Sequence, residues 1–105
     1  MSVYLQGSII ESEVRFLNPD TNTAADPTTV EFRYQIAGQS PTAAITYTSA
    51  TIPAVGVIAK LGIGWYKTWI DSTSFIGKTL EMWDGLGANQ APGDRWFEVI
   101  ARGSE

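Results

Sequence analysis

The chain has 105 residues, of which 44% are hydrophobic and 17% are charged, and its formal net charge is -4. This length suits one globular domain, and the composition excludes a chain that stays unfolded. The absence of cysteine and histidine excludes disulfides, thiol catalysis, serine–histidine triads and the usual zinc sites. The seven lysines and arginines form no cluster, so nucleic acid is not an expected partner.

No apolar run approaches the roughly 18 residues that cross a bilayer, and no basic segment precedes an apolar one near residue 1, so we expect neither a membrane span nor a signal peptide. We expect residues 1–8 to form an N-terminal arm rather than a core strand, residues 9–102 the folded domain, and residues 103–105 a polar tail. Because free termini usually fray, an apolar arm is ordered only where it docks, and a neighbouring subunit is the expected dock.

Alternating apolar and polar residues predict a first strand at about 10–17, with Val14 and Phe16 on one face. Residues 18–27 are rich in Asp, Asn, Thr and Pro, which favour turns, so we expect a loop there. The clearest strand is predicted at 28–36. Its apolar face consists of Val30, Phe32, Tyr34 and Ile36, and its other face is charged.

The next two predicted strands are shorter. The first covers 43–48, with Ile45 and Tyr47 pointing inward, and the second covers 55–61 and is rich in β-branched residues. Both are bounded by turn residues.

The stretch from Gly62 to Trp83 holds three of the four tryptophans. Two alternating runs, at 65–71 and 77–83, flank the polar segment 72–74, and each is bounded by glycine. This pattern predicts two adjacent antiparallel strands.

A last strand is predicted at 94–101, paired with the strand at 77–83 because sequential strands are usually neighbours. The total is about seven strands with turn signals between them, and no window has a helical period. The sequence therefore predicts an all-β protein, a seven-stranded sandwich of antiparallel sheets.

Several short motifs follow one another in a recognisable order. They are Phe16 at a strand end, an Asp/Asn-rich loop, Asp26-Pro27-Thr28-Thr29-Val30, Gly64-Trp65-Tyr66, Trp83-Asp84-Gly85-Leu86-Gly87 and Phe97-Glu98-Val99. In this layout the chain, from Val14 to Val99, resembles small immunoglobulin-like structural proteins of tailed bacteriophages. One departure concerns Thr79 and Glu81, which stand in phase with Trp83 where that family usually has aromatic residues. Either a bulge shifts the face before Trp83, or this half of the sheet packs differently.

The resemblance implies an immunoglobulin-like sandwich, a place in the virion after synthesis in the host cytoplasm, and no catalysis. We therefore expect a structural protein, either a capsid decoration or cement protein or a neck or tail component. Its partners would be other virion proteins and copies of itself, joined through many weak contacts. The expected contact residues are Tyr4, Leu5, Trp65 and Trp69.

Several acidic and amide residues could in principle form a metal site or a catalytic pair. Asp20, Asn22 and Asp26 carry oxygen ligands suited to Ca²⁺ but lack the spacing of a calcium loop, so we expect a turn and no metal or cofactor. The acids nearest in sequence, Glu11 with Glu13 and Glu81 with Asp84, could in principle form a glycosidase pair. Glu11 and Glu13 are more simply a solvated row on one strand face, and nothing in the sequence suggests a cleft. We therefore expect no catalytic residues.

The main alternative is a module that binds a host-surface glycan through exposed tryptophan. The candidate aromatic residues are Trp65, Trp69, Trp83 and Trp96, with Asp71, Asp84, Asn89 and Gln90 as polar neighbours. The competing interpretation is that two or more of these tryptophans fill the core and one lies in an oligomer interface, where tryptophan is enriched.

Overall fold

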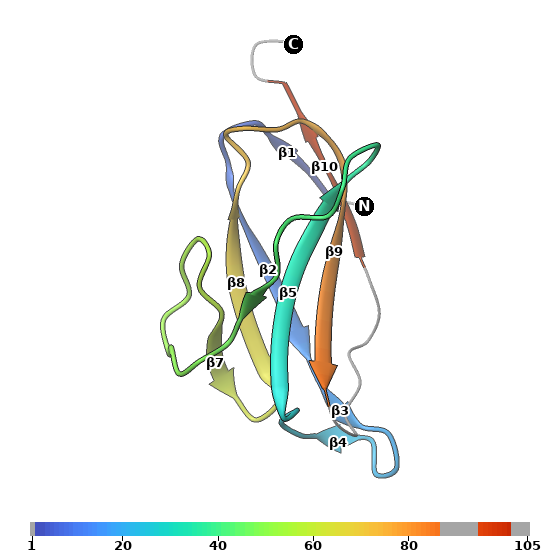
Figure 1. Cartoon of the computed structure of the whole chain (residues 1–105), viewed down its shortest axis with the longest axis vertical. Helices are drawn as coiled ribbons and strands as arrows, with labels where there is room; N and C mark the ends of the chain where they lie inside the picture. The colour runs from blue at the N-terminus through green and yellow to red at the C-terminus, as the bar shows by residue number, and fades with distance from the viewer. Residues whose placement is uncertain (1, 87–94, 102–105) are drawn as a thin grey trace.

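The computed structural model describes residues 2–86 and 95–101, and these residues form an all-β fold with no helix (Figure 1). Its strands are β1 (Ser2–Leu5), β2 (Ile9–Arg15), β3 (Leu17–Asn18), β4 (Thr23–Ala24), β5 (Thr29–Ile36), β6 (Ile45–Thr46), β7 (Ala59–Gly62), β8 (Trp65–Asp71), β9 (Gly77–Leu86) and β10 (Arg95–Ile100). The all-β prediction is confirmed. Within the described ranges, no helix is long and apolar enough to cross a membrane.

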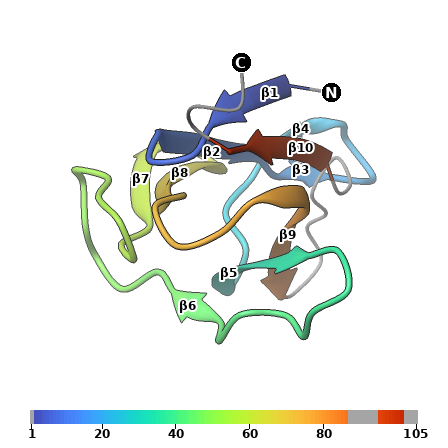
Figure 2. The same ribbon diagram turned by 90° about the horizontal axis from the view of Figure 1, so that it is seen from above.

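Two sheets pack against each other around a shared core. The larger has the order β1-β10-β9-β5-β6 and the smaller the order β2-β8-β7, while β3 and β4 form a separate short hairpin. Neighbouring strands pair antiparallel, except that β1 runs parallel to β10. Figure 2 shows β1 and β6 at opposite ends of the larger sheet.

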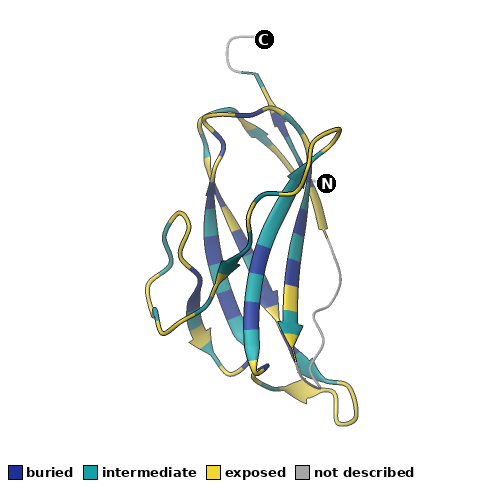
Figure 3. Ribbon diagram, viewed as in Figure 1, coloured by how far each residue is buried: buried dark blue, intermediate teal, exposed yellow. Residues whose placement is uncertain are grey.

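The core comes from the inward faces of both sheets, as the alternating buried bands along β5, β8 and β9 show (Figure 3). The smaller sheet contributes the buried residues Ile10, Val14, Tyr66 and Ile70, and the larger contributes Val30, Phe32, Trp83, Phe97 and Val99. The rings of Phe32 and Trp83 lie on adjacent strands, with centroids 4.7 Å apart. Such aromatic pairs add stabilisation beyond the burial of apolar area.

The strands on either side of residues 72–74 do not pair with each other, so the prediction of two adjacent antiparallel strands is wrong. β8 pairs with β2 and β7, whereas β9 pairs with β5 and β10. The connecting segment crosses between the sheets, where Phe75 is buried in the core and the Ser72 hydroxyl donates to the Ser8 carbonyl at 2.7 Å. These contacts, with residues far away in the sequence, hold the connecting segment in its path from one sheet to the other.

Most predicted strands are present, although their lengths differ. The strands predicted at 10–17 and 28–36 correspond to β2 and β5, and β10 pairs with β9 as predicted. The two short predictions shrink to β6 and β7, and Val55 and Val57 take part only in isolated bridges. Residues 2–86 and 95–101 contain ten strand segments where about seven strands were predicted, partly because most of the β3–β4 hairpin lies in the expected loop at 18–27.

Residues Ser2–Leu5 belong to the larger sheet, which differs from the arm predicted for residues 1–8. Tyr4 turns inward from β1, and its ring meets Phe97 edge-on at 5.9 Å. Burial of this ring against the chain's own core explains why the segment joins the sheet. The predicted tail at 103–105 lies outside the described residues, and the division of the chain at residues 9 and 102 stays a prediction.

Gly64 closes the turn into β8 with a left-handed backbone, at φ +67°. A Cβ atom there would lie 2.6 Å from the Phe16 carbonyl oxygen and 2.8 Å from that of Ala25. Both neighbours are backbone atoms, and the Phe16 amide already donates to the Gly64 carbonyl at 2.7 Å. Only glycine fits this position without moving the chain.

We predict that Gly64→Ala lowers the free energy of unfolding by about 3 kcal/mol or more, because strain and backbone overlap act together. The matched control is Gly38→Ala. Gly38 has a similar φ of +84° but open space around it, so its substitution should cost only about 1 kcal/mol. Urea denaturation of both variants checks this, and equal losses would contradict the steric argument.

Candidate functional site

A groove of about 950 Å³ opens between the two sheets beside β1, β2 and β10. It exists because β1 joins the larger sheet, which leaves β2 at the edge of the smaller sheet with no strand on its outer side. Its charged lining residues are Glu11, Glu13, Glu81, Lys67, Lys78 and Arg95, and its aromatic lining residues are Tyr4, Trp96 and Phe97.

Glu81 lies at the inner wall of this groove and is only 9% exposed. The Ser12 hydroxyl donates to Glu81 Oε1, and Trp83 Nε1 donates to Ser12 Oγ at 2.9 Å. Among the described residues, Oε2 of Glu81 has no hydrogen-bond partner. Burial raises the pKa of Glu81, and this effect exceeds the opposing effects of the Ser12 hydrogen bond and the Arg95 charge. Glu81 therefore presents a poorly solvated carboxylate oxygen to the groove.

The other charges of the groove are partly engaged with one another. Lys67 Nζ lies 3.5 Å from a carboxylate oxygen of Glu11 and 3.9 Å from one of Glu13. The Arg95 guanidinium donates to the Glu13 main-chain carbonyl. These contacts are exposed enough to be weak in energy, but they fix where the positive groups lie.

The contact between Arg95 and Glu13 also occupies part of the free edge of β2. The Phe16 amide faces β8, because it donates to the Gly64 carbonyl, so alternate residues turn their backbone groups outward. Glu13 is one of the outward residues, and Arg95 takes its carbonyl. A side chain capping an edge in this way hinders the addition of another strand.

The four predicted contact residues do not form one surface. Tyr4 faces inward beneath β1, whereas Leu5, on the outer face, is 50% exposed. Trp65 and Trp69 lie on the outer face of the smaller sheet, and both are half-buried. Their role as contacts stays a prediction.

Each of these two tryptophans has a local partner that covers it. The Arg15 guanidinium lies 4.2 Å from the ring centroid of Trp65, a cation–π contact. Trp69 lines a second, smaller pocket with Val55 and Gly56. In the structure, the Nε1 atoms of both tryptophans are buried without a hydrogen-bond partner. Trp96, at 49% exposure, is the tryptophan open to solvent, and Trp83 belongs to the core.

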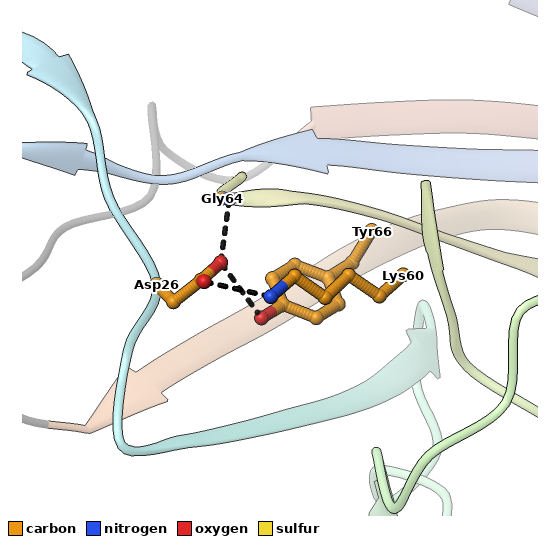
Figure 4. A network of polar contacts seen from close by, with 4 residues as sticks. All are labelled: Asp26, Lys60, Gly64 and Tyr66. Atoms are coloured by element: carbon orange, nitrogen blue, oxygen red, sulfur yellow. Dashed lines mark hydrogen bonds and ion pairs between the residues drawn. The ribbon is translucent and has the colours of Figure 1, made fainter. Parts of the chain in front are cut away.

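A second polar network surrounds Asp26, in the loop before β5 (Figure 4). Its carboxylate accepts from Lys60 Nζ at 2.7 Å, from the Gly64 amide at 2.7 Å and from the Tyr66 hydroxyl at 3.2 Å. Lys60 lowers the pKa of Asp26 most, followed by the Gly64 amide. The network ties the loop to β7 and to the start of β8, which is a structural role.

Of the three residues considered for Ca²⁺, Asp26 has its carboxylate bound to Lys60, while Asp20 and Asn22 belong to the turn between β3 and β4. Across residues 2–86 and 95–101, no group of three or more acids suited to a metal ion comes together.

Comparison of the chain with protein-family models, with curated proteins and with solved structures finds no match.

Neither Ser12 nor the groove was predicted from the sequence, and the packing of Glu81 was left open between two alternatives. The sequence did contain a signal that Glu81 faces the core, because Thr79, Glu81 and Trp83 are alternate residues and therefore lie on the same face of one strand. The pairing of β9 with β10 and β5 is continuous, without a bulge, so all three side chains point inward. Of the two alternatives stated for this strand, different packing is therefore correct.

We predict that Glu81→Gln raises the free energy of unfolding at pH 7. The raised pKa means that folding disfavours the ionised carboxylate, so the contribution of Glu81 to stability is intact below its ordinary value of 4.5 and falls as pH rises through the folded-state pKa. A neutral amide removes this loss while its oxygen still accepts from Ser12. Thermal unfolding from pH 3 to pH 8 checks this, and Glu98→Gln, on the outer face of the same sheet, is the matched control. A gain that does not shrink below pH 4.5 would contradict the explanation.

We predict that Asp26→Asn lowers the pKa of Tyr66, which stands at about 12 because of burial first and of the charge and hydrogen bond of Asp26 next. The same change should cost about 1 kcal/mol of stability, since the Asp26 side chain is 38% exposed and solvent screens its charge. Ultraviolet titration of tyrosine ionisation measures the first effect and urea denaturation the second. An unchanged titration would show that burial alone sets the Tyr66 pKa.

Proposed function

We propose that the chain is a non-enzymatic structural protein that acts through protein–protein packing, built on an immunoglobulin-like sandwich. The strand orders support the fold part of this proposal. The order β2-β8-β7 corresponds to strands B, E and D of such a sandwich, and β10-β9-β5 to strands G, F and C, with β6 beside them. The chain departs from the seven-stranded form in that β1 lies along β10 and an extra hairpin follows β2.

The observation that carries the functional proposal is the apolar outer face beside β1. Val3 is 56% exposed and Leu5 50%, and the cross-strand partner of Leu5 is Ile100, which is also exposed. Trp96 lies on the same outer face of β10, four residues before Ile100, and Glu98, the cross-strand partner of Val3, lies between them. Apolar side chains gathered on one exposed face are typical of interaction surfaces.

The free edge of β1 supplies the polar part of such a contact. The Gln6 amide donates to the Ile100 carbonyl at 2.8 Å, so Val3 and Leu5 direct their backbone amides away from β10. β1 contains neither proline nor a charged residue, the features that usually protect an edge strand.

Two copies can satisfy these groups by pairing β1 with β1 antiparallel about a two-fold axis. This arrangement is self-complementary, so it closes as a dimer. It would also bring together Val3, Leu5 and Ile100 of both copies on one continuous face. We therefore take a second copy of the chain as the first partner.

A place in the virion follows from the resemblance of the sequence to phage structural proteins and is part of the same proposal. In a particle, symmetry repeats each contact many times, so weak individual contacts are sufficient. The capsid surface, the neck and the tail are all compatible with a protein of this kind.

We predict that the purified chain self-associates and that Val3→Lys combined with Leu5→Lys weakens this association at least tenfold, because lysine places charge at the edge. Ile63→Lys is the matched control, since Ile63 is equally apolar and exposed but lies before β8. Sedimentation velocity over a range of concentrations measures the association. A chain that stays monomeric throughout, or equal weakening by the control, would contradict the edge contact.

The proposal that the protein is part of a virion is tested separately, by a mass-spectrometric count of the protein in purified virus particles. Many copies per particle are expected, and the absence of the protein from particles would contradict it.

A further inference from the structure

The groove between the sheets has a mixed lining whose charges cancel. Its carboxylates are those of Glu11, Glu13 and Glu81, and its cations are those of Lys67, Lys78 and Arg95. An anionic ligand would meet three carboxylates there, and a cationic ligand would meet three positive groups. A long apolar ligand would desolvate all six charges at a high cost. The lining therefore fits a neutral ligand that both donates and accepts hydrogen bonds.

The inner wall of the groove offers a hydrogen-bond acceptor to such a ligand. Glu81 is about nine-tenths buried, and its Oε2 has no hydrogen-bond partner among the described residues. The relay from Trp83 through Ser12 satisfies only Oε1. Oε2 is therefore available to accept a hydrogen bond from a ligand hydroxyl.

The rim of the groove supplies the complementary groups. Arg95 and Lys78 carry donors, and the exposed ring of Trp96 and the half-buried ring of Tyr4 offer flat apolar faces. Sugar rings present hydroxyls at their edges and apolar C–H groups on their faces, so they match donors, acceptors and aromatic faces at once.

A neutral peptide also donates and accepts, but its way of binding here would be to add a strand to β2. Arg95 already occupies the outward carbonyl of Glu13 on that edge. Strand addition would have to displace this contact, whereas an oligosaccharide can use the side chains as they stand.

We propose that this groove is a binding site for a neutral oligosaccharide, with Glu81 accepting a hydrogen bond from a sugar hydroxyl and Trp96 stacking on a ring. The proposal goes beyond assembly through β1 and does not depend on it. It also assigns the sugar contact to Trp96, Tyr4 and Glu81, and leaves Trp65 and Trp69 outside the site.

The experiment measures tryptophan fluorescence and binding heat of the full chain with hexasaccharides of maltose, cellulose, chitin and mannan type, each up to about 10 mM, a range that detects millimolar affinity. Saturable quenching by at least one of them is expected. Glu81→Gln should weaken that binding about tenfold, and Trp96→Ala should weaken it similarly and remove the quenching. Glu98→Gln, outside the groove, should bind as the unaltered chain does.

Because Glu81→Gln is expected to stabilise the fold and Trp96 is exposed, unfolding does not explain a loss of binding by either variant. Thermal unfolding of each variant verifies this. Failure of all four saccharides to bind would overturn the proposal. So would binding that neither substitution changes, or binding of a neutral alternating Thr-Val peptide in place of the saccharides.

Discussion

The hydrogen-bond relay from Trp83 through Ser12 to Glu81 joins the two sheets within the core, and much of the structure depends on it. Ser12 belongs to β2 in the smaller sheet, while the other two residues belong to β9 in the larger. Apolar contacts alone tolerate small shifts of one sheet over the other, whereas hydrogen bonds between buried groups require one alignment. The relay thus specifies how the sheets face each other, and its acidic end gives the groove its character.

The two strand edges beside the groove differ in the side chains that flank them. The outer edge of β2 is capped where Arg95 binds the Glu13 carbonyl, so that side is kept as a surface of side chains. On the outer edge of β1 the Leu5 carbonyl accepts from the Ser8 amide and hydroxyl. That edge is otherwise flanked by exposed Val3 and Leu5 and carries no charged residue. One edge is therefore suited to pairing with another chain and the other is suited to a ligand held by side chains, and the two can operate together.

The sequence was informative where the structure is determined locally. The alternation of Val30 and Phe32 with polar residues placed β5 and its buried face, because a strand's period of two follows from backbone geometry alone. Which sheet each strand joins is not determined by nearby residues. The segment after β8 is compatible with a hairpin, and the contact of Ser72 with Ser8, far away in the chain, decides that it crosses instead. The exposure of tryptophans was equally non-local, since Arg15 covers Trp65 from the neighbouring strand.

The same reasoning explains why the groove could not be predicted. The groove exists because β1 pairs with β10 and not with β2. Residues 2–5 alone do not determine which of these two strands β1 pairs with. Burial of the Tyr4 ring against Phe97 favours β10. This pairing leaves β2 uncovered and Glu81 open to the groove through one oxygen.

A neutral group that kept the hydrogen bond from Ser12 would make the fold more stable, because the partly buried charge of Glu81 opposes folding. A destabilising group beside an opening is a common property of binding sites, where stability is reduced in favour of function. Glu81 is such a group. It lies beside the groove with one carboxylate oxygen unpaired, and the packing of the core does not account for a carboxylate at this position.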